Sequence, residues 1–183
     1  MMRIISGSRR GKKLLSLEGE NTRPTLERVK QAFFSAIQFE IAKRTVLDLF
    51  AGSGQLGLEA LSRGADFCFF NDISKDACNI IQKNILACDF GKMSQLTCKS
   101  YADCVKIVKS SKKTVSLVFL DPPYGKGLVS DSLALLVDAD VLEDGAIVVC
   151  ESADSDNIIC EGFLLHKEYN YSGIKVTILR YQK

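Results

Sequence analysis

The sequence predicts an α/β fold in which helices cover both faces of a mostly parallel β-sheet. Five short apolar runs alternate with single amphipathic segments through most of the chain. Strands of this type, separated by single helices, are typical of parallel sheets that are buried on both faces. A glycine-rich turn follows the first run, at the place where such folds commonly bind a ligand.

The length predicts a single domain over residues 1–183, because 183 residues allow one buried core and little more. No apolar run approaches the roughly 18 residues of a membrane span, and the charged start predicts no secretory signal, so we expect a cytoplasmic protein. The seven cysteines form no C-x-x-C pair, and most lie in apolar runs, which predicts reduced thiols and no metal site.

Basic residues gather in an N-terminal arm, residues 1–24, which precedes a core over residues 25–183. Residues 1–30 hold eight basic and three acidic side chains, a net charge of +5, so the remaining 153 residues sum to −3. Such an arm predicts contact with a polyanion, and a solvated tail is the alternative that charge alone leaves open. The side chains expected to bind phosphate are Arg9, Arg10, Lys12 and Lys13.

After the arm, a helix is predicted to open at Pro24-Thr25. Apolar residues then recur at helical spacing, namely Leu26, Val29, Phe33, Ile37 and Ile41. The predicted strands that follow are 45–50, 66–71, 94–99, 115–120 and 145–150. The predicted helices between them are 55–63, 74–88, 101–111 and 128–138.

The C-terminal part breaks the alternation. The β-like runs 163–169 and 174–181 are separated only by residues 170–173, too few for a crossover helix. They predict an antiparallel hairpin at the edge of the sheet. His166, the one histidine of the chain, lies in this hairpin, where we expect a structural role rather than a catalytic one.

The glycine turn has the spacing G-x-G-x-x-G at Gly52, Gly54 and Gly57, between a strand and a helix. Glycines there permit a tight turn and a close approach of the backbone to a ligand. The pattern alone is weakly specific. However, Asp72 ends the next strand about 20 residues later, where a carboxylate can accept hydrogen bonds from a ribose diol. Together these features predict a ligand that contains adenosine.

A dinucleotide and S-adenosylmethionine both contain adenosine, and charge distinguishes them. Asp48 precedes the glycines on the first strand, where its carboxylate would repel a pyrophosphate at the helix N-terminus. The same carboxylate would balance the cationic amino group of a methionine moiety, which favours S-adenosylmethionine. A cap for local backbone is the alternative role of Asp48.

The run VFLDPPYGKG at residues 118–127 ends a predicted strand at the same edge of the sheet. Pro122 and Pro123 remove two backbone N–H groups and stiffen the turn. The Asp121 carboxylate and the Pro122 carbonyl remain as acceptors for both hydrogens of a substrate amine, so that its lone pair faces a methyl donor. Tyr124 offers a flat face on which a base can stack. A rigid turn without chemistry is the alternative.

At this point the sequence resembles a family, the bacterial 16S rRNA (guanine-N2)-methyltransferases of the RsmD type. The matching segments are RIISGSRRGKKL, TRPTLERVKQAFFSAI, LDLFAGSGQLGLEALSRGA, FNDISKDACNIIQKNI, VFLDPPYGKG and VVCES. The resemblance implies a Rossmann-like, class I S-adenosylmethionine-dependent methyltransferase fold, with a seven-stranded, mostly parallel sheet that ends in an antiparallel hairpin. It also implies that the arm and Arg23-Pro24-Thr25 border the cofactor and the RNA.

The expected cofactor site then comprises Arg23, Thr25, Asp48, Phe50, Ala51, Gly52, Ser53, Gly54, Asp72, Ile73 and Ala102. The sequence departs from the family at two of its positions. Asp72 stands where relatives mostly have Glu, and Tyr101 stands where they often have Asp or Asn near the adenine. The adenine contact is therefore left open among Tyr101, Ala102 and Asp103.

The favoured hypothesis is an enzyme that methylates an exocyclic base amine in RNA, with guanine N2 of 16S rRNA in the small ribosomal subunit as the expected target. We expect rRNA or the small subunit as partner, no membrane, and a monomer. A DNA amino-methyltransferase is an alternative, although it would normally need a separate target-recognition region. A protein-glutamine methyltransferase is a less favoured alternative, because such enzymes usually have Asn at the position of Asp121. A non-catalytic RNA-binding factor would not need the glycines together with Asp72 and Asp121.

Overall fold

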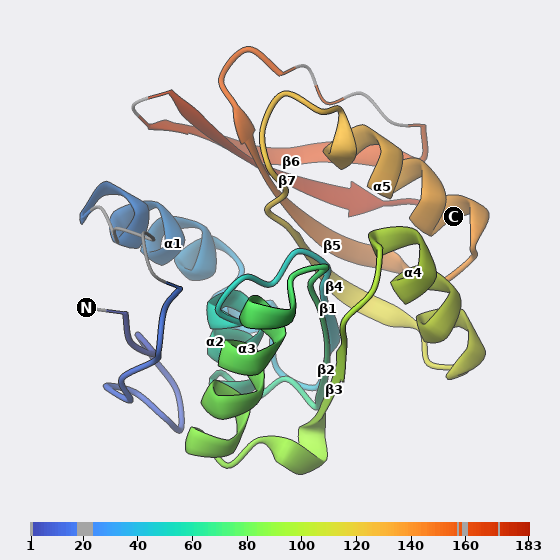
Figure 1. Cartoon of the computed structure of the whole chain (residues 1–183). Helices are drawn as coiled ribbons and strands as arrows, with labels where there is room; N and C mark the ends of the chain where they lie inside the picture. The colour runs from blue at the N-terminus through green and yellow to red at the C-terminus, as the bar shows by residue number, and fades with distance from the viewer. Residues whose placement is uncertain (1, 18–23, 157, 159–160, 172) are drawn as a thin grey trace.

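A computed structural model of the chain has a seven-stranded sheet between two layers of helices (Figure 1). It describes residues 2–17, 24–156, 158, 161–171 and 173–183, with residues 24–27 described by their backbone alone. The strand order is β3-β2-β1-β4-β5-β7-β6. The pairs from β3 to β5 are parallel, and β7 is antiparallel to both β5 and β6. The predicted fold class, with its C-terminal hairpin, is confirmed.

The strands are β1 (Thr45–Asp48), β2 (Phe67–Asn71), β3 (Ser94–Thr97), β4 (Val115–Leu120), β5 (Leu142–Ala153), β6 (Phe163–Tyr171) and β7 (Ile174–Tyr181). The α-helices are α1 (Pro24–Ala36), α2 (Gln55–Ser62), α3 (Lys75–Ala87), α4 (Tyr101–Ser110) and α5 (Leu128–Asp138). Two 3₁₀-helices, Gln38–Glu40 and Gly91–Met93, were not predicted.

The largest difference from the predicted boundaries is in β5, which extends three residues beyond the apolar run 145–150 at each end. Its early part includes Glu143, Asp144 and Gly145, which are exposed. The pairing with β4 shifts register between Val115 and Leu117. Backbone pairing therefore extends the strand through residues that show no apolar alternation.

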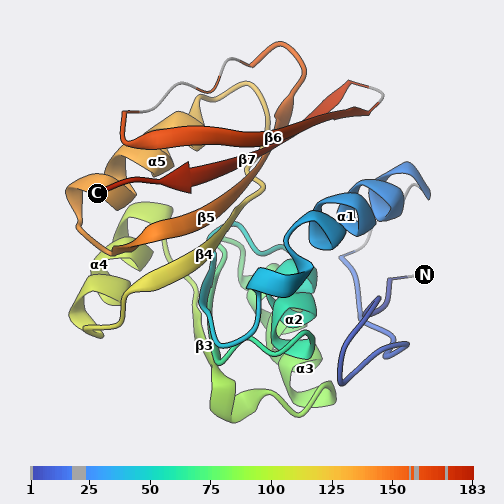
Figure 2. The same cartoon turned by 180° about the vertical axis from the view of Figure 1, so that it is seen from behind.

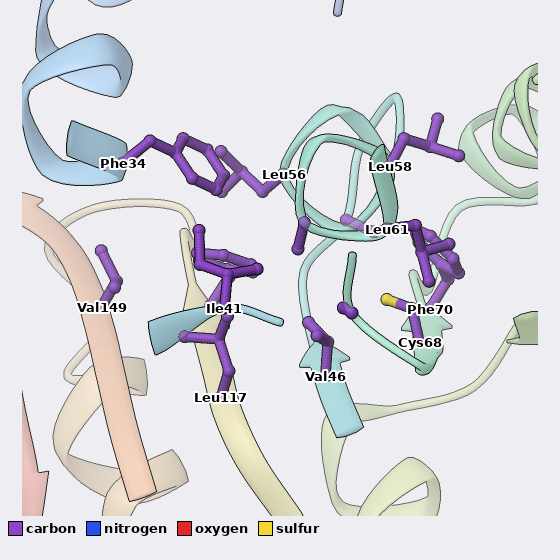
Figure 3. Close-up of a cluster of buried hydrophobic side chains, with 14 of the residues drawn as sticks. Phe34, Ile41, Val46, Leu56, Leu58, Leu61, Cys68, Phe70, Leu117 and Val149 are labelled. Atoms are coloured by element: carbon purple, nitrogen blue, oxygen red, sulfur yellow. The ribbon is translucent and has the colours of Figure 1, made fainter. Parts of the chain in front are cut away.

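Two hydrophobic cores lie on opposite faces of the sheet, because successive side chains of a strand point to opposite sides. Val46 of β1 joins the core under α1, α2 and α3, where Phe34, Leu56 and Phe70 also lie (Figure 3). Leu47 of β1 joins the core under α4 and α5. Both faces are thus covered, as the continuous apolar strands predicted.

The N-terminal arm folds back onto the body, so the solvated-tail alternative is wrong for residues 2–17. In both views the arm lies beside α2 and α3 (Figures 1 and 2). Met2, Ile4 and Leu14 are buried. Gly7 has φ +83°, and a Cβ there would lie 1.8 Å from the carbonyl oxygen of Ser62, so only glycine fits this close approach.

Polar side chains of α2 and α3 hold the arm through its backbone. The carboxylate of Glu59, which is 1% exposed, accepts hydrogen bonds from the backbone N–H groups of Ile5 at 2.6 Å and Ser6 at 3.0 Å. The side-chain amide of Asn84, also 1% exposed, accepts from the N–H of Leu15 at 2.8 Å and donates to its carbonyl at 2.9 Å. The arm is therefore a packed part of the fold.

Among the described residues, no helix is both long and apolar enough to cross a membrane.

We predict that Gly57→Ala destabilises the fold by about 1–2 kcal/mol. The added methyl would gain about 1 kcal/mol of helix propensity. It would, however, lie 2.3 Å from Cε1 of the buried Phe70 ring and 2.7 Å from Sγ of Cys68, and overpacking of this kind costs about 1–3 kcal/mol or more. Urea unfolding measures the difference. The control is Gly91→Ala, whose Cβ meets open space and should change stability by less than about 0.5 kcal/mol. Equal stabilities for the two variants would contradict the prediction.

Candidate functional site

A cavity of about 1020 Å³ opens at the carboxyl ends of the parallel strands, between the glycine loop and the Asp-Pro-Pro-Tyr turn. The strand order reverses between β1 and β4, which is the switch point where α/β sheets commonly bind ligands. The predicted residues that line the cavity are Phe50, Ala51, Gly52, Ser53, Asp72, Ile73, Asp121, Pro122, Pro123 and Tyr124. Its volume matches the upper end of the roughly 300–1,000 Å³ of cofactor and drug-sized sites.

The glycine loop has a left-handed backbone conformation at two positions, which favours glycine there. Gly52 has φ +54° and Gly54 has φ +78°, both in the left-handed region. The N–H of Gly54 donates to the carbonyl of Ala51 at 2.6 Å, which closes the turn before α2. The carbonyl of Ser53 accepts from Asn84 at 2.9 Å, so the residue that holds the arm also holds this loop.

Asp72 lies at the end of β2 with its carboxylate fixed by two backbone donors. Gly52 N–H donates to Oδ2 and Ser74 N–H donates to Oδ1, both at 2.9 Å. Each carboxylate oxygen keeps a further lone pair for a ligand hydroxyl. Asn71, buried behind it, donates to the carbonyls of Leu49 and Lys99 and so ties the ends of the strands together.

Asp48 lies behind the wall of the cavity. Its side chain is 1% exposed, and Oδ2 accepts from the N–H of Gly57 at 2.9 Å. Burial raises the pKa of Asp48 to about 7, opposed by the Gly57 hydrogen bond and the charge of Lys30 and aided by the charge of Asp72. Gly54 and Ala102 are likewise absent from the described lining of the cavity. The direct cofactor contacts expected of these three residues remain predictions.

Two further predicted residues cannot be placed. Arg23 and the side chain of Thr25 lie outside the described residues.

Aromatic and aliphatic side chains form the part of the cavity next to Asp72. The rings of Phe50 and Tyr101 lie with their centroids 5.9 Å apart, and Ile73 leaves 77% of its surface exposed beside them. Asp103 instead accepts from Ser100 and pairs with Lys106 at 3.0 Å. Tyr101, Ala102 and Asp103 were the three candidates for the adenine contact. Of these, Tyr101 lines the cavity.

The Asp-Pro-Pro-Tyr turn continues directly from β4, with Pro122 buried and Asp121 partly exposed. Tyr124 leaves 45% of its surface exposed, and its hydroxyl donates to Oε1 of Glu151 at 2.6 Å. Burial, together with the adjacent Glu151 carboxylate, raises the pKa of Tyr124. The Tyr124 hydroxyl is therefore protonated and acts as a hydrogen-bond donor at neutral pH. Its hydrogen bond to Glu151 fixes the position of the ring.

Several lining residues were missed from the sequence. Met2 and Leu17 reach the cavity from the arm, and Met2 Sδ accepts from the hydroxyl of Ser53 at 3.1 Å. Lys30, Lys99 and Lys126 add positive charge to the wall. Lys126 lies within the quoted VFLDPPYGKG run and could have been found there. The others have no local signal, because only the tertiary fold brings them to this edge.

The predicted phosphate-binding residues differ in their surroundings. Arg9 donates to the carbonyl of Cys88 at 2.7 Å and pairs with Asp89 at 3.5 Å. Part of its charge and hydrogen-bonding capacity is therefore taken up by contacts within the protein. Arg10, Lys12 and Lys13 are exposed. These three present their charge to solvent on the outside of the docked arm.

We predict that Asp48→Asn removes a pH dependence of stability. The native state keeps the Asp48 proton up to a pH of about 7, whereas the unfolded chain loses it near 3.8. Ionisation therefore favours the unfolded chain, and the contribution of Asp48 to wild-type stability falls as pH rises from about 4 to about 7 and then levels off. The variant should gain relative to wild type over this window, by about 4 kcal/mol at most (a shift of about three pKa units at about 1.36 kcal/mol each). Urea unfolding at pH 4.5, 6 and 8 measures this, with the exposed Asp131→Asn as control. Parallel curves for wild type and Asp48→Asn would refute the prediction.

Known proteins resemble this chain over most of its length. The family model described as "Conserved hypothetical protein 95" matches residues 2–180. The ribosomal RNA small subunit methyltransferase D of Haemophilus influenzae is 36% identical over 170 residues, which are 91% of this chain and 87% of that protein. The protein of the same name from Escherichia coli K12 is 31% identical over 169 residues, 91% of this chain and 83% of that protein. The solved structure of yhhF from Escherichia coli superposes with a TM-score of 0.86 at 27% identity, and the match covers 99% of this chain and 98% of that one.

These matches confirm the resemblance found in the sequence. The chain belongs to the Conserved hypothetical protein 95 family, which is the RsmD family of ribosomal RNA small subunit methyltransferases.

Proposed function

We propose that this protein transfers a methyl group from S-adenosylmethionine to the exocyclic N2 amine of a guanine in the rRNA of the small ribosomal subunit. The observation that carries the proposal is the single cavity that joins the glycine loop and Asp72 to the Asp-Pro-Pro-Tyr turn. A cofactor site and an amine-binding turn face each other there. The relatives named ribosomal RNA small subunit methyltransferase D support RNA as the substrate.

The cofactor would lie along the glycine loop. Asp72, oriented by Gly52 and Ser74, would accept hydrogen bonds from the ribose hydroxyls. Tyr101, Phe50 and Ile73 would enclose the adenine ring with apolar surface. The methionine end would then lie toward Lys30, whose ammonium group suits the carboxylate of an amino acid, and toward Asp48 behind the wall, whose ionised form would suit its ammonium group.

The turn would hold the target amine by its two hydrogens, one on the Asp121 carboxylate and one on the Pro122 carbonyl. The nitrogen lone pair then faces the methyl carbon, the new C–N bond forms as the C–S bond breaks, and the sulfonium becomes a neutral thioether. The nitrogen becomes acidic only as it gains the methyl group, so its surplus proton can pass to Asp121 or to water. Positioning supplies most of the catalysis in this scheme.

A polyanionic substrate is favoured by where the positive charge lies. Arg10, Lys12 and Lys13 are exposed on the arm, and Lys99 and Lys126 are exposed at the cavity itself. A base in structured RNA would have to leave its stack to reach the turn. As part of the proposal, the arm 1–24 and the core 25–183 act together as one domain, the protein acts as a monomer, and it acts in the cytoplasm, where rRNA is present.

We predict that Asp121→Ala lowers methyl transfer by about 100-fold or more while S-adenosylmethionine still binds, because the amine loses its charged acceptor. Single-turnover methylation of small subunits measures transfer, and calorimetry measures cofactor affinity. The control is Asp131→Ala, which removes an exposed carboxylate from the next helix. Retained transfer in Asp121→Ala would exclude the assigned role.

We predict that changing Arg10, Lys12 and Lys13 together to Ala weakens RNA binding and leaves cofactor affinity unchanged. Log affinity decreases with log salt concentration, and this decrease should become shallower by about two to three in slope, since each phosphate contact contributes about 0.7–0.9. Arg9 is changed separately, because it also holds the arm to α3.

The matched control for the arm removes three positive charges elsewhere, at Lys106, Lys109 and Lys113. Lys106 and Lys109 lie in α4, and Lys113 lies just after it. The cavity is lined by Tyr101 at the opposite, N-terminal end of this helix. An equal loss of RNA affinity in both triple variants would count against a specific role for the arm.

The experiment that tests the function itself offers labelled S-adenosylmethionine to small subunits and free 16S rRNA that lack the modification, and to DNA. Label in the N2 position of a guanine in either RNA substrate is the expected result. Label in DNA alone, or in none of the three, would reject the proposal.

A further inference from the structure

A second, smaller cavity of about 220 Å³ adjoins the cofactor cavity across the Asp-Pro-Pro-Tyr turn. The two cavities share Pro122, Pro123, Tyr124, Lys126 and Leu128 in their walls. The larger one adds Asp121, and the smaller one adds Glu151 and Ser152 from the end of β5. The smaller volume lies below the roughly 300–1,000 Å³ of sites for drug-sized ligands, so it suits part of a base rather than a whole nucleotide.

Two buried polar groups of this small cavity need partners. Glu151 is 8% exposed, and among the described residues its carboxylate receives a hydrogen bond from the Tyr124 hydroxyl alone. A carboxylate has about four acceptor positions, and a buried charge with few hydrogen bonds is costly. Ser152 is 1% exposed, and its hydroxyl has no partner within the part of the chain that the structure describes.

The position of these groups follows from strand geometry. Glu151 and Ser152 are neighbours in β5, so their side chains leave the strand on opposite sides. The cavity that both residues line lies at the carboxyl end of β5, next to the end of β4, where Asp121 follows. A base that enters from the cofactor cavity would bring its edge here.

The charge of the cavity indicates the kind of ligand. The first residues of α5 and the Lys126 side chain line it and would attract an anion, but the carboxylates of Glu151 and Asp156 lie there too and oppose one. A carboxylate favours a neutral ligand group that carries N–H. Among amino-bearing bases, only guanine has a ring N–H, at N1, directly beside its exocyclic amine. Adenine and cytosine present a ring nitrogen acceptor there, which a carboxylate would repel.

We infer that Glu151 is a specificity residue that accepts the N1–H of the target guanine while Asp121 and Pro122 hold its N2 amine. Tyr124 orients Glu151 by its hydroxyl and stacks on the same base by its ring. This inference rests on the proposed function and gives a physical basis for the choice of guanine.

The test compares guanine with 2-aminopurine, which keeps the N2 amine but lacks the N1 hydrogen and O6. Wild-type protein first identifies the modified nucleotide in small subunits, and subunits are then reconstituted with 16S rRNA that carries either base there. We expect wild-type kcat/KM to be about 10- to 100-fold higher for guanine, as a hydrogen bond to a charged group would give. Glu151→Ala should lower this ratio about tenfold.

Two further variants separate recognition from folding. Glu151→Gln keeps the size of the side chain and an acceptor for Tyr124, and should lower the ratio several-fold through the loss of charge. Glu143→Ala, on the exposed early part of the same strand, should leave the ratio unchanged. Melting temperature and cofactor affinity are measured for each variant.

An unchanged ratio in a folded Glu151→Ala or Glu151→Gln protein would overturn the inference while leaving the proposed function intact. A wild-type protein that does not discriminate between the two bases would do the same. Absence of methyl transfer by the wild type to guanine would instead overturn the proposed function, and this inference with it.

Discussion

The parallel pairing of β1 with β4 is the constraint on which the site depends. Asp48, the last residue of β1, pairs with Phe119, which lies two residues before Asp121. The chain must leave both strands at the same edge, so the glycine loop and the Asp-Pro-Pro-Tyr turn face each other across one cavity. A slip of one residue would move every apolar side chain of β1 to the wrong face, and the two buried cores prevent it.

Around this pairing, two aspartate side chains accept hydrogen bonds from backbone N–H groups of the glycine loop and the start of α2. Asp48 binds the N–H of Gly57 and Asp72 binds that of Gly52. The first carboxylate is buried and has its pKa raised to about 7, whereas the second is open to the cavity. The same residue type is therefore internal support in one place and, in the proposed function, a group that binds the cofactor in the other.

A few buried groups connect the arm with the glycine loop and the cavity. Glu59 and Asn84 hold its backbone against α2 and α3, and Asn84 also holds the glycine loop at Ser53. Met2 consequently lines the cavity. At the other side of the cavity, the hydrogen bond from Tyr124 to Glu151 connects the turn to β5. The docked arm, the glycine loop and the Asp-Pro-Pro-Tyr turn are thus connected at one edge of the sheet.

The sequence by itself determined the fold class and the family, and it located the glycine loop, Asp72 and the Asp-Pro-Pro-Tyr turn that line the cavity. These features are local: apolar alternation, glycines at positions that need positive φ, and prolines that end β4 are all visible within a few residues. The tertiary structure alone decided that Asp48 lies behind the cavity wall, that the arm is docked, and that Lys30 and Glu151 reach the two cavities. Burial and contacts between residues far apart in the chain depend on how the strands are ordered in space. That order cannot be read from a short run of neighbouring residues.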